Sequence, residues 1–192
     1  MEKKQVKQMV MDENGNLGVY AISFVDMPAI ESDFVFLSKQ HIQLENTNEE
    51  KRMVYGAVLI PDKLILRAGK DGEDDYYIQF PKETVRAAAY AFMKQGNQHE
   101  HTLQHAMKVA GCTVVESWIK EADDDKSKAL TIDVPVGTWL VGIKVDNDSV
   151  WEQVKAGEVK GFSIEGFFDT MEKMSSLESQ ILEEARTFVQ SM

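Results

Sequence analysis

Short stretches that alternate apolar and polar residues, or that are rich in β-branched and aromatic residues, predict strands along most of the chain. The first is residues 17–24, and Pro28 soon after it prevents simple continuation of the ladder. Three more are expected at residues 53–60, 63–69 and 75–80. Because only Pro61-Asp62 and a Gly/Asp-rich segment separate these three, we expect them to form an antiparallel meander.

The second half of the chain shows the same pattern. It predicts strands at residues 112–119, 129–135, 138–145 and 160–168. The acidic segment 120–128 lies between the first two, so we expect it to be the loop of a surface hairpin.

Helical spacing occurs in three segments. Residues 81–96 carry Val85, Ala88, Ala89 and Phe92 on one face and end at Gly96, a plausible C-cap. Residues 150–158 follow N-cap candidates at 146–149 and lead into the last strand. Residues 173–192 form an amphipathic pattern that either packs on the sheet or binds a partner. With a polar, mobile connection at 38–52, we expect one domain over 1–172 and a separate C-terminal helix over 173–192.

Composition narrows the function. The net charge of −11 argues against the clustered Lys and Arg that nucleic-acid binding draws on, so no nucleic-acid partner is expected. Cys112 is the only cysteine, which excludes an intramolecular disulfide and a cysteine zinc knuckle. No segment resembles a signal peptide or reaches the length of a membrane span, so we expect a cytoplasmic protein without a membrane partner.

Three of the four histidines lie close together, at His99, His101 and His105. The zincin motif His-Glu-x-x-His is absent, because Leu103 stands where its second histidine belongs. His101 and His105 could share a helical face and bind a metal with Glu100 or Glu116, which makes a metal-binding module one alternative. The plainer interpretation of His99 and His101 is a solvated polar loop.

A serine occupies the middle of the last predicted strand, KGFSIEGFF, as Ser163. A serine hydroxyl is a poor nucleophile unless an imidazole takes its proton and a third group orients the imidazole. No Gly-x-Ser-x-Gly elbow surrounds Ser163, which argues against an α/β-hydrolase. Residue pattern alone leaves open whether Ser163 reacts or simply fills a small space in a sheet.

Several motifs resemble those of phage prohead serine proteases of the XkdF type. They are TLQHAMKVAGCTVVESWI, VPVGTWLVGIKV and KGFSIEG, together with the early GVYAISFVDMPAIESDFV. The resemblance runs from about Gly18 to Phe168. These proteases are similar in turn to herpesvirus assemblins, which use a histidine and a strand-borne serine. The resemblance implies Ser163 as nucleophile and His105 as its base.

The third catalytic residue stays open between two carboxylates. No histidine follows Ser163, so the second histidine of the assemblins has no counterpart here. Glu116 lies in the strand after His105, on the same face as Val114, and is our prediction; Glu165, two residues from Ser163 and on its face, is the alternative. Gly137 is a candidate for the oxyanion loop, and Trp118, Trp139 and Trp151 are interpreted as core residues.

The resemblance implies a fold and a function. We expect an α+β protein with a mainly antiparallel, barrel-like sheet and a few flanking helices, as in capsid maturation proteases. It would be a serine endopeptidase without cofactor or metal that cleaves phage scaffold and major capsid proteins, and could cut itself. It would act in the host cytoplasm inside the immature head, with self-association possible. The alternative is a non-catalytic scaffolding protein that keeps the protease fold.

Overall fold

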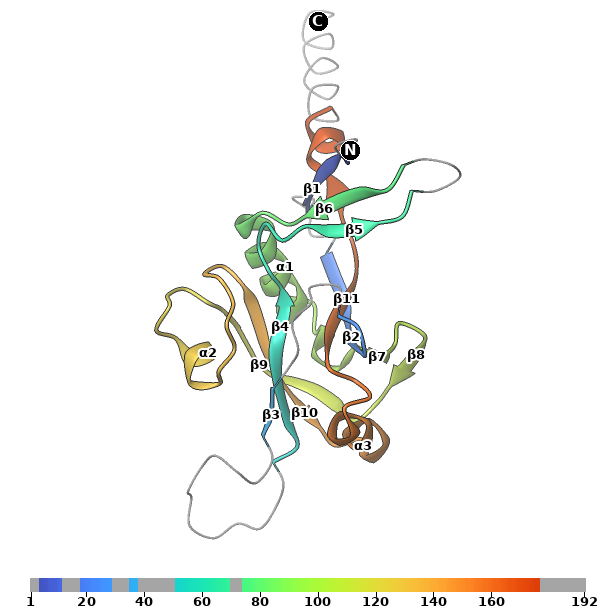
Figure 1. Ribbon diagram of the computed structural model, residues 1–192, viewed down its shortest axis with the longest axis vertical. Coiled ribbons are helices and arrows are strands. Elements are labelled where there is room, and N and C mark those ends of the chain that lie inside the picture. The colour runs from blue at the N-terminus through green and yellow to red at the C-terminus, as the bar shows by residue number, and fades with distance from the viewer. Residues whose placement is uncertain (1–3, 12–17, 29–34, 38–50, 70–73, 177–192) are drawn as a thin grey trace, which may run out of the picture.

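The structure is a computed structural model, and it describes residues 4–11, 18–28, 35–37, 51–69 and 74–176. These residues form three four-stranded sheets (Figure 1). The upper sheet has the order β12-β1-β6-β5, with β1 Val6–Val10, β5 Ile65–Arg67, β6 Tyr76–Gln79 and β12 Asp169–Thr170. The tryptophan sheet has the order β3-β4-β10-β9, with β3 Val35–Leu37, β4 Met53–Leu59, β9 Cys112–Ile119 and β10 Trp139–Val145. The serine sheet has the order β11-β2-β7-β8, with β2 Gly18–Val25, β7 His101–Leu103, β8 Met107–Val109 and β11 Gly161–Phe167.

The predicted mixed α+β class is confirmed, but the barrel-like sheet is not. Most strand pairs are antiparallel, while β1–β6 and β2–β7 are parallel. The strands of the described residues divide into three separate sheets and do not close into a barrel. No helix in the described part of the chain combines the length and apolar character needed to span a membrane.

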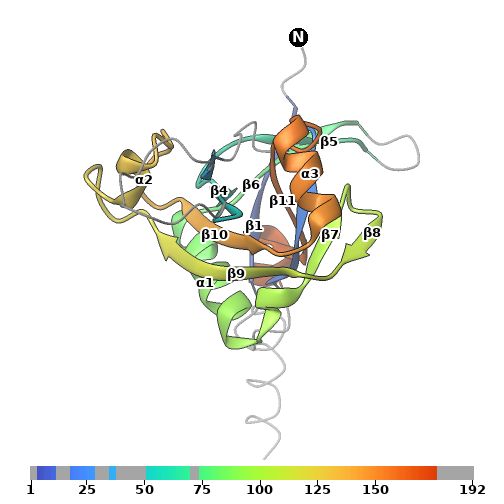
Figure 2. The same ribbon diagram turned by 90° about the horizontal axis from the view of Figure 1, so that it is seen from below.

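The two longer helices both contact the tryptophan sheet through β10. Helix α1 Lys82–Lys94 buries the predicted face, Val85, Ala88, Ala89 and Phe92, and is followed by Gly96 in the left-handed conformation, one residue beyond the C-cap Gln95. The ring of Phe92 in α1 lies 5.4 Å from that of Trp139 in β10, and the two rings meet edge to face. Figure 2 shows the course of α1 and β10 in the fold. Helix α3 Asp148–Ala156 begins where expected, because the Asn147 side chain accepts a hydrogen bond from Val150 N. The short helices η1 Asn97–His99 and α2 Lys126–Ala129 complete the set.

The predicted meander is wrong. Strands β5 and β6 pair with each other, but β4 belongs to the tryptophan sheet, where it pairs with β3 and β10. The reason lies in its burial: every residue from Val54 to Leu59 is buried, so both faces of β4 need a covering that a surface meander does not give.

The predicted strand at 129–135 and its hairpin are also wrong. The Asp125 side chain accepts a hydrogen bond from Ser127 N and starts α2, and β9 pairs with β10 instead. Ile132 and Val134 are both buried, so an extended, unpaired segment shows the same alternation as a strand.

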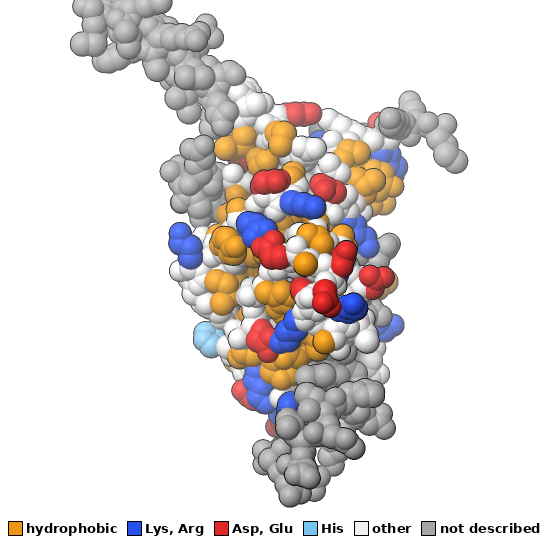
Figure 3. All heavy atoms as spheres, turned by 90° about the vertical axis from the view of Figure 1, so that its left-hand side faces the viewer, with side chains coloured by type: hydrophobic (Ala, Val, Ile, Leu, Met, Phe, Trp, Pro, Cys, Tyr) orange, Lys and Arg blue, Asp and Glu red, His pale blue; other side chains and the backbone are white. Residues whose placement is uncertain are grey.

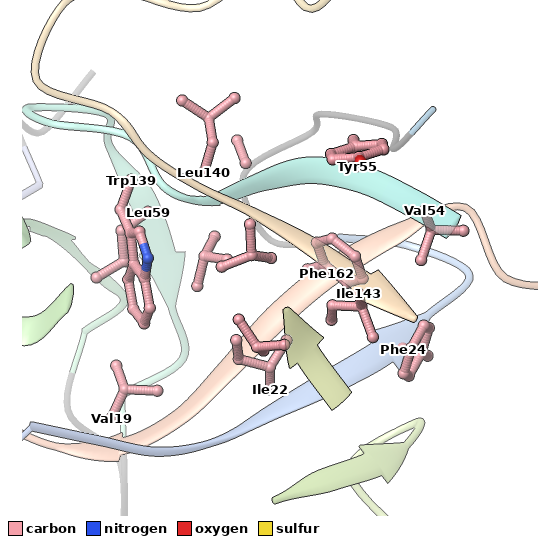
Figure 4. Close-up of a cluster of buried hydrophobic side chains, with 14 of the residues drawn as sticks. Val19, Ile22, Phe24, Val54, Tyr55, Leu59, Trp139, Leu140, Ile143 and Phe162 are labelled. Atoms are coloured by element: carbon pink, nitrogen blue, oxygen red, sulfur yellow. The ribbon is translucent and has the colours of Figure 1, made fainter. Parts of the chain in front are cut away.

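The main core lies between the serine sheet and the tryptophan sheet. Figure 4 shows Ile22, Phe24 and Phe162 of the first packed with Val54 and Ile143 of the second. The rings of Phe24 and Phe162 meet edge to face at 5.6 Å. The predicted connection at 38–52 and the predicted C-terminal helix lie largely outside the described residues, which include helical backbone at 171–176.

On the side from which α2 projects, acidic, basic and apolar side chains are interspersed (Figure 3).

Candidate active site

Ser163 lies on the face of the serine sheet opposite the core. In β11 the neighbouring residues Phe162 and Ile164 pack into the core, so alternation turns Ser163 and Glu165 to the other face. Its cross-strand partner in β2 is Ser23. Two serines therefore meet directly opposite each other in the middle of the sheet.

His105 lies in the tight turn that joins β7 to β8. Gln104 and His105 have φ values of 52° and 55°, and Ala106 N donates to Leu103 O at 3.0 Å. Positive φ at both central residues is the geometry of a type I′ hairpin, which usually selects Asn or Gly there. Two hydrogen bonds hold the turn against β2: Gln104 N donates to Phe24 O at 2.9 Å, and His105 N donates to Ser23 Oγ at 3.0 Å.

The imidazole of His105 faces Glu165. Its Nδ1 lies 3.2 Å from Glu165 Oε1, and the same oxygen accepts a hydrogen bond from the Thr102 hydroxyl. The side chain of Glu165 is 17% exposed and that of His105 42% exposed, so the pair opens to solvent on the imidazole side. A carboxylate at Nδ1 favours the tautomer with its proton there, and Nε2 is left to accept a proton from another group.

These contacts bring Ser163, His105 and Glu165 to one region of the serine sheet. Ser23 is the cross-strand partner of Ser163 and the hydrogen-bond partner of His105 N, while Glu165 lies two residues from Ser163 on the same face. Among the described residues no direct hydrogen bond joins the Ser163 hydroxyl to His105. Long nucleophile-to-base contacts are common in catalytic sites without substrate.

The structure does not bring Glu116 to His105. Glu116 lies in β9 of the tryptophan sheet, where it accepts a hydrogen bond from the Tyr55 hydroxyl at 2.7 Å and forms an ion pair with Lys126. The residue between Tyr55 and Glu116 is Gly142, and its missing side chain lets the tyrosine ring cross to the carboxylate. Burial raises the pKa of Tyr55 and lowers that of Lys126. Glu165, the sequence alternative, is the carboxylate beside the histidine.

The other two histidines do not form a metal site with His105. His101 is fully buried in β7, so its predicted position in a solvated loop is wrong, and it shares no helical face with His105. Its Nδ1 and Nε2 lie 3.2 and 3.1 Å from the carbonyl oxygens of Ile22 and Gln98, and burial lowers its pKa. No group of three potential ligands suited to a metal ion occurs within the described residues.

Two further candidates have structural roles. The N–H of Gly137 donates to Lys120 O at 2.8 Å within a turn and is not free to bind an oxyanion. Trp139 and Trp151 are fully buried, as expected of core residues, whereas Trp118 is partly buried and donates from Nε1 to Asp125.

Sequence reasoning missed Ser23 and Thr102. A signal for Ser23 exists, because Ile22-Ser23-Phe24 is the reverse of Phe162-Ser163-Ile164, and antiparallel pairing aligns like with like. Thr102 is the partner of Ser23 in the neighbouring strand β7, a pairing between distant segments that the local sequence pattern does not indicate.

Comparisons with known proteins agree with the sequence motifs. A family with the description "Putative phage serine protease XkdF" matches residues 41–172, a range that contains His105, Ser163 and Glu165. Two proteins of Bacillus subtilis (strain 168) are similar to the chain. "Uncharacterized protein YqbD" is 29% identical over 174 residues, which are 86% of this chain and 49% of that protein. "Phage-like element PBSX protein XkdF" is 28% identical over 170 residues, 82% of this chain and 55% of that protein. The chain thus spans about half the length of the curated relatives it matches. No solved structure matches it.

Proposed function

Because the chain belongs to the family of phage serine proteases of the XkdF type, we propose that it is a serine endopeptidase with Ser163 as nucleophile, His105 as general base and Glu165 as the group that orients the imidazole. The observation that carries this assignment is the contact of 3.2 Å between His105 Nδ1 and Glu165 Oε1, on the sheet face that presents Ser163. Glu116, engaged by Tyr55 and Lys126, is not needed for it.

The proposed reaction is acyl transfer to water. His105 Nε2 takes the proton of the Ser163 hydroxyl as Oγ attacks a peptide carbonyl, and the imidazolium then gives this proton to the leaving amine. Water next attacks the acyl-serine, again with His105 as base, and releases the second product. Glu165 stabilises the imidazolium in both steps and keeps the ring from turning away.

The proposed substrates are proteins of the phage head. Resemblance to prohead proteases supports phage scaffold and major capsid proteins, and the chain itself, as substrates cleaved inside the immature head in the host cytoplasm. The rival is a scaffolding role without catalysis, and the lack of a direct Ser163–His105 hydrogen bond among the described residues is the observation that favours it.

Co-expression distinguishes the two. The protein, as wild type or Ser163→Ala, is produced with the scaffold and capsid proteins encoded beside it, and all products are weighed by intact-mass spectrometry. Ser127→Ala is the control, because Ser127 is a fully buried serine in α2 on another part of the fold. Cleavage with wild type and Ser127→Ala, but not with Ser163→Ala, supports the protease; identical masses in all three favour the scaffolding role.

A further inference from the structure

We propose that Ser23 is a positioning residue of this site: its buried hydroxyl holds the His105 turn in place, while Thr102 beside it holds Glu165. This inference rests on the proposed function and adds two residues to the proposed machinery. Neither would touch the substrate; both would act through the imidazole and its carboxylate.

The burial and hydrogen bonds of Ser23 indicate that it positions its neighbours and does not itself react with a substrate. Its side chain is fully buried in the central strand β2, so its hydroxyl cannot reach a substrate carbonyl. The hydroxyl oxygen accepts the hydrogen bond from His105 N at 3.0 Å and lies 3.4 Å from Thr102 O, to which it can donate. Both polar functions of the group are thus directed to β7 and the turn that follows it.

The turn needs this support because of its backbone conformation. A left-handed residue other than glycine costs roughly 1–2 kcal/mol, and the turn contains two in succession, Gln104 and His105. Such conformations persist where surrounding contacts fix them. Two of the turn's hydrogen bonds reach β2, and the one to His105 itself ends on a side chain, Ser23 Oγ, instead of the backbone. Substitution can therefore remove that bond without altering the sheet ladder.

Thr102, directly opposite Ser23 in the sheet, contacts the Glu165 carboxylate. It is the β7 partner of Ser23, which in turn is the partner of Ser163, so the three hydroxyl residues form one row across three strands. The Thr102 hydroxyl donates to the Glu165 oxygen that faces His105 Nδ1. Ser23 thus fixes the backbone of His105, and Thr102 fixes the Glu165 carboxylate that faces the imidazole.

The test measures the reactivity of Ser163 with a fluorophosphonate probe, which needs no knowledge of the natural substrate. In the reaction Ser163 Oγ bonds to phosphorus, the P–F bond breaks, fluoride leaves, and His105 takes the serine proton. Labelling at Ser163 is followed by peptide mass spectrometry over a range of probe concentrations, which separates the maximal rate from the half-saturating concentration. Hydrogen exchange at the His105 amide is measured in parallel.

Ser23→Ala is compared with Ser127→Ala, which removes an equally buried hydroxyl that bonds to Asp125 in α2. We expect Ser23→Ala to lower the maximal labelling rate roughly 10–100-fold with unchanged half-saturation, and to speed exchange of the His105 amide. Ser127→Ala should label at the wild-type rate, although it too loses a buried hydrogen bond. This contrast separates positioning from general loss of stability.

Thr102→Val and Thr102→Ser provide a second pair that does not depend on the folding of Ser23→Ala. The valine variant should lose rate and the serine variant, which keeps the hydroxyl, should recover it. Unchanged labelling in Ser23→Ala, or equal rates for both Thr102 variants, would overturn the positioning role while leaving the protease intact. A wild type that is never labelled at Ser163 would overturn the proposed function and the positioning role together.

Discussion

Replacing Glu165 by glutamine is the sharpest probe of the proposed catalytic group. The amide keeps the size of the side chain, and its oxygen can still accept the hydrogen bond from Thr102. What is lost is the negative charge 3.2 Å from His105 Nδ1, and with it the stabilisation of the imidazolium that forms when Ser163 gives up its proton.

The size of the effect follows from the separation and the exposure. Two unit charges at this distance attract by about 1.3 kcal/mol in bulk water and by about 5 kcal/mol at the effective dielectric constant near a protein surface. These limits correspond to rate losses of about ninefold and about 5,000-fold. Because the His105 side chain is 42% exposed, solvent screens the pair, and we expect a loss of about 100-fold, between the two limits.

The assay is the rate of Ser163 labelling by the fluorophosphonate probe, with Glu116→Gln as the matched control. Glu116 is a charged strand residue of the same type, but its partners are Tyr55 and Lys126 on the other sheet. The control should label at close to the wild-type rate. A loss below about ninefold for Glu165→Gln, which is less than the bulk-water limit, would refute the reasoning. A larger loss for Glu116→Gln than for Glu165→Gln would refute it too.

Three further predictions concern stability and reactivity. Burial raises the pKa of the Cys112 thiol to about 12, so the native protein should not react with Ellman's reagent at about pH 8, whereas the denatured protein should; rapid reaction of the native protein would contradict this. Burial lowers the pKa of His101 below its usual 6.5, so the unfolded state binds more protons than the folded state between the two values, and the free energy of unfolding should fall as the pH drops below 6.5. Urea titrations across this range should show that slope, and His101→Gln should make it shallower; an equal slope in the variant would assign it to other groups. A Cβ at Gly142 would lie 2.5 Å from Tyr55 Cε1, so Gly142→Ala should lower the free energy of unfolding by about 1–3 kcal/mol in urea, and an unchanged midpoint would show that the ring can move aside.

The spacing of apolar residues predicted individual helices and strands well where the sequence of the element itself determines its structure. Helix α1 buries the four residues that its spacing indicated, and β2, β9, β10 and β11 occupy their predicted segments. Pairing was not predictable in the same way, because it depends on contacts between distant segments. Strand β4 pairs with β10, whose residues lie 80 or more positions away along the chain, while the pattern favoured pairing with the next strand in the sequence.

In the candidate site too, relations within one strand were predictable from the sequence, whereas relations between distant segments were not. Ser163 and Glu165 share one strand, so alternation alone placed them on one face, and the structure retains that relation. For Glu116 alternation gave a face of β9 but not the sheet to which β9 belongs, and the strand lies in the tryptophan sheet. The place of His105 depends on a left-handed turn of two residues without glycine, a conformation for which the sequence carries no local signal.

The mirrored segments of β2 and β11 connect the core to the site. A slip of β11 by one residue against β2 would turn Ser163 into the core and bring Phe162 out of it. Burial of one such side chain contributes about 1.5–3 kcal/mol, whereas a partly exposed hydrogen bond such as that between His105 and Glu165 contributes about 0.5–1.5 kcal/mol. The hydrophobic side chains therefore determine the register, and the polar residues inherit their positions from it. The hydroxyl row and the Glu165 carboxylate can then be arranged for reactivity, since the register of the sheet does not depend on them.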